Sequence, residues 1–304
     1  MRTLKCFLVV LVVATAAYGQ PKENQQLTDI RTLEKETSLK PDSADAWQNL
    51  GLAQYREQHF ALAADALEHA RQLAPKSAQV NNNLGFAYLF SNRWDEAIAS
   101  FKAALEEDPH CITARRGLCS AYSLSEKGQQ AVETCLNAIK DDNGSAVARY
   151  FLGHTYLDMG DGEKAVATFE DAARLEPTSA RVFVGLGFAY YSMKKYDLAL
   201  TALQHAKDLD PNADELLSGL GAVYAQMHEY KKAEKIIREA LARNPDHPTN
   251  HFNLGVVCLM RKNRDCAFSE YNYLRLKDDP RAEILLSRIN SNKVLDASAY
   301  KPRQ

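Results

Sequence analysis

The stretch NNNLGFAYLF at residues 81–90, followed by RWDEAIASFKAALEEDP at residues 93–109, decides how the whole chain is interpreted. Apolar and small residues recur at helical spacing around Gly85, and again around Phe101, so each stretch predicts one amphipathic helix. Pro109 ends the second helix, because proline cannot continue the hydrogen-bonding pattern. The two stretches therefore predict a pair of antiparallel helices joined by a short turn.

The same pattern returns at a constant step of 34 residues. A small residue recurs in the first helix at Gly51, Gly85, Cys119, Gly153, Gly187, Gly221 and Gly255. An alanine recurs in the second helix at Ala63, Ala97, Ala131, Ala165, Ala199, Ala233 and Ala267. One helix pair cannot bury its apolar face alone, so seven such units are expected to stack into one continuous array.

This pattern resembles the tetratricopeptide repeat family, and the resemblance covers residues 44–281 as seven units. It implies an all-α solenoid, a right-handed superhelix of antiparallel helix pairs whose first helices line a concave groove. Residues 20–43 are then expected to form a half-repeat whose helix caps the N-terminal end. Residues 282–304 are expected to form a capping helix and a tail.

The first residues of the chain predict export. Arg2 and Lys5 precede an apolar run that ends near Ala17, and small residues lead up to Gln20, as in a secretory signal peptide. We therefore expect residues 1–19 to be cleaved and the protein to be periplasmic or secreted. An uncleaved membrane anchor is the alternative, and association with other proteins is a second way to reach a membrane.

Composition and motifs disfavour several classes of function. The formal net charge is −2 and the charges are interspersed, so no basic stripe suits a nucleic acid. The sequence lacks the local signatures of common nucleophile, phosphate and metal sites, which predicts a protein that is not an enzyme and binds no cofactor or metal. His247 and His251 are four residues apart, but a solvated turn at a unit boundary explains them more simply.

The cysteines allow two interpretations. Within their units, Cys119 and Cys135 occupy positions 8 and 24, and Cys258 and Cys266 occupy positions 11 and 19. In a hairpin that folds back near its middle, each pair would face across the two helices and could form a disulfide. The alternative is that all four are small core residues with free thiols. Cys111 is left over under either interpretation.

The family resemblance also implies where a partner would bind, since contacts in the family come mostly from fixed positions on the first helices. The residues at such positions are largely apolar or aromatic, and an extended or helical protein segment suits such a surface. The alternative for each one is packing against neighbouring helices. The expected groove residues are Asn49, Asn83, Phe86, Leu89, Tyr150, Phe151, His154, Phe188, Tyr191 and Asn253.

The favoured function is a non-enzymatic scaffold that binds a protein or peptide segment outside the cytoplasm. The alternative is a structural component of a cell-envelope complex, of export or pilus type, that docks through its outer surface. Contact with a polysaccharide through exposed aromatic residues is a weaker third interpretation. The sequon at Asn143 lies in an expected turn and would matter only in a host that glycosylates exported chains.

Overall fold

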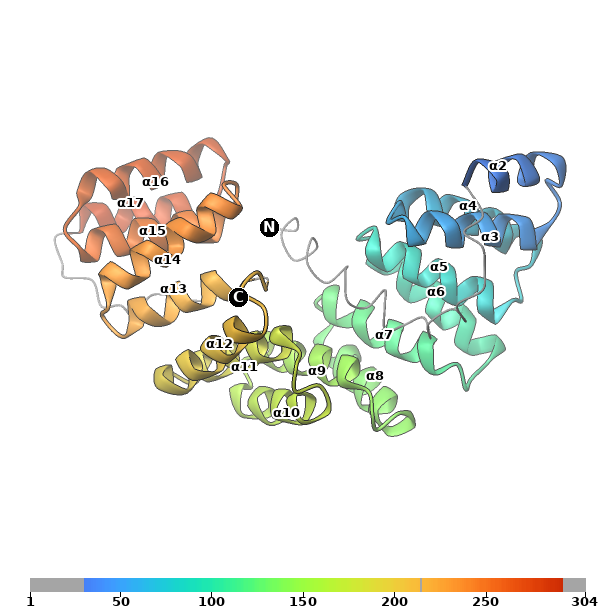
Figure 1. The fold of residues 1–304 in the computed structure, drawn as a ribbon, viewed down its shortest axis with the longest axis horizontal. Coiled ribbons are helices and arrows are strands. Elements are labelled where there is room, and N and C mark those ends of the chain that lie inside the picture. Colours follow the sequence, from blue (N-terminus) through green and yellow to red (C-terminus); the bar gives the residue numbers. More distant parts are fainter. Residues whose placement is uncertain (1–29, 214, 292–304) are drawn as a thin grey trace. The chain divides into compact units, whose positions relative to one another are not determined.

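The computed structural model describes residues 30–213 and 215–291, which are almost entirely helical and contain no strand (Figure 1). The expected signal segment at residues 1–19 and most of the expected C-terminal tail lie outside these described residues. Among the helices that are described, none combines the length and the hydropathy needed to cross a bilayer.

Helices of 11 to 14 residues alternate along the seven units. The first helices of the units are α3 (Ala44–Arg56), α5 (Ala78–Phe90), α7 (Ile112–Leu124), α9 (Ala146–Asp158), α11 (Ala180–Ser192), α13 (Leu216–Gln226) and α15 (Pro248–Met260). The second helices are α4 (Phe60–Leu73), α6 (Trp94–Glu107), α8 (Gly128–Asp141), α10 (Gly162–Leu175), α12 (Tyr196–Leu209), α14 (Tyr230–Arg243) and α16 (Arg264–Leu276). Two further helices, α2 (Ile30–Leu39) and α17 (Arg281–Asn290), stand before and after them.

The chain divides between Met159 and Gly160 into two compact units, which hold α2–α9 and α10–α17. Within each unit, helices that are neighbours in sequence pack side by side, and the two helices of a repeat contact each other along their length (Figure 1). The core of each unit is therefore built by stacking local hairpins, as the periodicity predicts.

Four of the seven first helices, α3, α5, α9 and α15, begin at a side-chain cap. Ser43, Ser77 and Ser145 each accept a hydrogen bond from a backbone N–H in the first turn of α3, α5 and α9, which satisfies a donor that the helix itself leaves free. The corresponding residue before α13 is Ala213, whose methyl group cannot accept such a bond. This helix begins two residues later than the repeat predicts, after Glu215 in the left-handed conformation.

The turn inside each repeat requires a residue with positive φ at one fixed position. The residues in this conformation recur every 34 positions as Gln58, Asn92, Glu126, Gly160, Lys194, His228 and Lys262. Glycine adopts this conformation without steric cost, but it occupies the position only once. The packing of the hairpins thus holds the six other residues at this position in a strained backbone conformation.

Large side chains of the second helices fill the space left by glycines of the first helices. In the first unit the fully buried ring of Phe101 lies against both Gly85 and Gly117, which belong to successive repeats. In the second unit Leu203 lies in the same way against Gly187 and Gly219. One side chain therefore holds two neighbouring repeats together, and only glycine leaves room for it.

The end helices cover the outermost repeats of the units. Leu33 of α2 is buried in a cluster with Leu50 and Ala53 of α3. Leu285 and Ile289 of α17 are fully buried, and Leu285 lies against Gly255 of α15. Each capping helix thus buries an apolar face that would otherwise be exposed at the end of a solenoid.

Candidate functional site

The first helices lie closer together than the second helices in each unit. Contacts join α3 to α5, α5 to α7 and α7 to α9 in the first unit, and α11 to α13 and α13 to α15 in the second. No comparable contact joins successive second helices among the described residues. The first helices therefore line the inner side of each unit, where the family resemblance places a ligand.

Most of the expected groove residues are packed inside this side of the structure. Asn83, Phe86, Leu89, Phe151, Tyr191 and Asn253 are buried. The ring of Phe86 meets the ring of Phe101 edge-on, with 4.9 Å between centroids. The four apolar or aromatic residues among them, Phe86, Leu89, Phe151 and Tyr191, are packed in the cores of their units. For all six buried residues a direct contact with a partner stays a prediction.

Four of the expected residues are accessible. Asn49 is exposed on α3, and Tyr150, His154 and Phe188 are partly exposed. Tyr150 and His154 lie one helical turn apart on α9, with 4.5 Å between their ring centroids. They form a partly exposed aromatic pair on one helix. The buried ring of Phe151 packs against this pair, with 5.4 Å between the ring centroids of Phe151 and Tyr150.

The fourth position of the first helix has a role that the sequence analysis missed. Side chains there donate to the backbone carbonyl six residues earlier, at the end of the preceding repeat. The bonds run from Trp47 to Pro41 (2.8 Å), from Asn81 to Pro75 (3.0 Å), from Arg115 to Pro109, and from His251 to Pro245 (2.7 Å). The four donors are chemically different, so their common position in the repeat is the only feature of the sequence that could have predicted this hydrogen bond.

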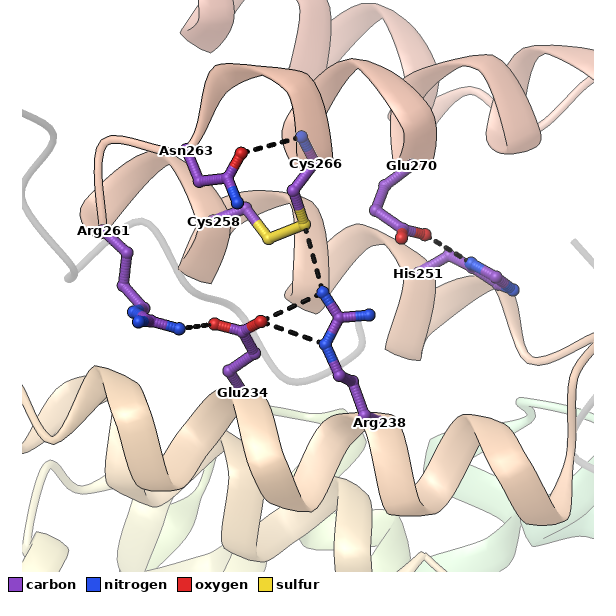
Figure 2. Close-up of a disulfide and its surroundings, with 8 residues drawn as sticks. All are labelled: Glu234, Arg238, His251, Cys258, Arg261, Asn263, Cys266 and Glu270. Carbon is purple, nitrogen blue, oxygen red and sulfur yellow. Dashed lines mark hydrogen bonds and ion pairs between the residues drawn. A yellow bond between two sulfur atoms is a disulfide. The ribbon is translucent and has the colours of Figure 1, made fainter.

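His251 combines this role with a charge. Its Nδ1 lies 2.6 Å from Glu270 Oε2 (Figure 2). Its Nε2 lies 2.7 Å from the Pro245 carbonyl oxygen. Both partners are acceptors, so only the protonated ring can donate to both. Burial lowers the pKa of His251. The hydrogen bonds to Glu270 and Pro245 and the nearby charges of Glu270 and Asp246 raise this pKa by more than burial lowers it, so the net shift is upward.

Replacing His251 is expected to make stability less dependent on pH. The pKa of His251 is higher in the folded chain than in the unfolded chain. The stabilisation that the charged ring contributes to the folded state is therefore complete below the unfolded pKa of about 6.5. That contribution is lost as the pH rises through the folded pKa. Denaturation of His251→Gln should therefore show a loss of about 1–2 kcal/mol at low pH that shrinks toward alkaline pH. The exposed His110, as His110→Gln, is the control, and a constant difference at all pH values would contradict this account.

Two disulfides join the helices of single repeats. Cys119 and Cys135 link α7 to α8 with their Cα atoms 4.8 Å apart, and both residues are fully buried. Cys258 and Cys266 link α15 to α16 across the turn with their Cα atoms 5.9 Å apart (Figure 2). Cys111 is the free cysteine among the described residues.

Comparison with protein families decides the identity of the fold. Models described as tetratricopeptide repeat match residues 29–78, 78–111 and, in overlapping segments, 124–254. The chain belongs to the tetratricopeptide repeat family. Members of this family are generally non-enzymatic modules for protein–protein interaction. The predicted family and the all-α solenoid are therefore confirmed.

Solved structures support the same fold for this tetratricopeptide repeat protein. A chain of the Cut9–Hcn1 hetero-tetramer of the APC/C is 18% identical over 86% of the chain, with a TM-score of 0.68, although the chain spans only 52% of that protein. A tetratricopeptide repeat protein from Parabacteroides merdae is 16% identical over 81% of the chain and 98% of its own, with a TM-score of 0.66. PilF of Pseudomonas aeruginosa is 20% identical over 69% and 97%, with a TM-score of 0.58. No curated protein matches the chain in sequence.

Proposed function

We propose that this tetratricopeptide repeat protein is an exported, non-enzymatic scaffold that binds a partner segment on the inner side of its first helices. The observation that carries the binding site is the pair Tyr150 and His154 on α9. Partly exposed aromatic residues on a helix that is fixed by packing lose little entropy on binding, which makes them suitable anchors. The partner is accordingly a segment of protein with apolar or aromatic side chains.

Export rests on the residues before Gln20 and on the two disulfides. Disulfides persist in oxidising compartments and are rare in the cytosol, so a chain that forms two of them suits the periplasm or the outside of the cell. Mass analysis of the native protein should find a mature N-terminus at Gln20. A native protein that keeps residues 1–19 would contradict cleavage and favour an anchored form.

Substitution of either residue of the aromatic pair is expected to weaken binding. Peptides selected from a display library against the chain beginning at Gln20 should bind Tyr150→Ser and His154→Ala at least about tenfold more weakly. The unfolding midpoint of each variant is measured beside its binding, because Tyr150 packs partly against the core of its unit and weaker binding must be that of a folded chain.

Leu136→Ser is the matched control, since Leu136 is 48% exposed on the second helix α8, next to α9. This variant should bind the selected peptides as well as the unchanged chain does. Weaker binding by Leu136→Ser, with full binding by the α9 variants, would place the partner on the outer face and favour a docking role in a larger assembly.

A further inference from the structure

The two disulfides differ in their access to solvent. Cys119 and Cys135 are both 0% exposed, so no dissolved thiol can reach either sulfur while the repeat is folded. Cys258 is 1% exposed, but Cys266 is partly exposed near the start of α16. A thiol in solution can therefore approach the bond between α15 and α16 from the side of Cys266.

Cys266 also lies in an environment that favours its thiolate. The Nη2 atom of Arg238 on α14 lies 3.6 Å from the Cys266 sulfur (Figure 2). Cys266 is in the first turn of α16, where its backbone N–H donates to the capping side chain of Asn263 at 3.1 Å. A guanidinium group and a helix N-terminus both stabilise a thiolate.

The position of Arg238 is set by a second ionic contact. Glu234, one turn earlier on α14, accepts from Arg238 Nε and Nη2 at 3.0 Å, and it also forms an ion pair with Arg261 at the end of α15. Figure 2 shows the carboxylate between the two guanidinium groups. Arg238 is thereby held beside the sulfur even though its side chain is 53% exposed.

We propose that the bond between Cys258 and Cys266 is a thiol–disulfide exchange site for a dithiol reductant, and that Cys119–Cys135 is a permanent structural crosslink. A reductant thiolate attacks Cys266 Sγ and forms a mixed disulfide, while the electron pair of the broken bond leaves on Cys258 Sγ, which takes up a proton. The second thiolate of the reductant then attacks the reductant sulfur. Cys266 leaves as a thiolate beside Arg238, and the reductant ends as an intramolecular disulfide.

Selective reduction of the folded chain tests this proposal. The full chain is equilibrated with graded ratios of reduced to oxidised dithiothreitol, quenched in acid and alkylated, and each cysteine pair is then quantified by mass spectrometry. We expect Cys258 and Cys266 to become reduced at ratios that leave Cys119–Cys135 oxidised and the helical circular dichroism unchanged. Reduction of both pairs together, or only as the helices unfold, would overturn the proposal.

Substitution of Arg238 tests the role of the guanidinium group. Arg238→Met should require about threefold more reduced dithiothreitol to reach half reduction, because the thiolate product loses a charged partner that is itself solvent-exposed. Arg238→Lys should restore part of the effect. Arg174→Met is the control, since Arg174 forms an exposed ion pair with Asp171 in the same unit and contacts neither disulfide.

The pH dependence of alkylation separates this effect from a change in stability. In a Cys258→Ala background, Cys266 is a free thiol and its rate of reaction with iodoacetamide reports its pKa. Arg238→Met should move the midpoint of that rate profile to higher pH, and Arg174→Met should leave it in place. Identical profiles for all three chains would remove Arg238 from the proposal.

Discussion

Gly85→Leu is expected to lower the free energy of unfolding by about 3 kcal/mol or more, because the added side chain must displace a buried ring. A Cβ atom on Gly85 would lie 2.6–2.9 Å from three atoms of the Phe101 ring, which is closer than non-bonded carbon atoms approach each other in proteins. Phe101 is fully buried and also lies against Gly117, so its ring has no free space into which it can move. Denaturation in guanidinium chloride, followed by circular dichroism, measures the change.

Further variants test whether the effect of Gly85→Leu comes from the contact between Gly85 and the Phe101 ring. Phe101→Ala alone should cost about 4 kcal/mol, but combined with Gly85→Leu it should cost clearly less than the sum, since the new leucine occupies the space left by the ring. Gln79→Leu, at an exposed position of α5, should change stability little. A midpoint for Gly85→Leu equal to that of the unchanged chain would show that the repeats do not depend on this contact.

Removal of the disulfide between Cys119 and Cys135 is the second large effect. The bond joins residues 16 positions apart, and the double variant Cys119→Ala, Cys135→Ala should lose about 3 kcal/mol through the greater freedom of its unfolded chain. The unchanged chain beginning at Gln20 should show one reactive thiol, Cys111, when it is denatured without reductant. Five thiols, or a double variant of full stability, would contradict this part of the account.

The period of the sequence predicted the helices because each one is fixed by local residues. The first helices α3, α5, α7, α9 and α11 begin at the first residue of their units, where a turn and a capping position precede an amphipathic pattern. The missing side-chain cap at Ala213 does not by itself account for the late start of α13, because α7 and α11 begin on time after Cys111 and Ser179, which make no such bond. The positive φ at Gln58 or Lys194 could not be predicted from residue type, because it is imposed by the packing of the hairpin.

The site was less predictable than the fold. Family positions identify which helix faces inward, but they do not tell whether an aromatic side chain contacts a ligand or fills the wedge between repeats. Phe86 and Tyr150 both occupy such positions, and only the structure shows that Phe86 is buried against Phe101 while Tyr150 stays partly exposed. Likewise, the spacing of Cys258 and Cys266 suggested a link between helices, whereas Arg238 lies 28 residues from Cys266 and no local pattern connects them.

Site-specific photocrosslinking tests the central claim, which is that a partner segment lies on the inner side of the first helices. A photoreactive benzoylphenylalanine replaces Tyr150 on α9 in one chain and Leu136 on α8 in another. Each folded chain is then irradiated with the peptides that were selected against the unchanged chain. The account predicts a crosslink from the position of Tyr150 and none from that of Leu136. A crosslink from the position of Leu136 alone would contradict it and place the partner on the second helices.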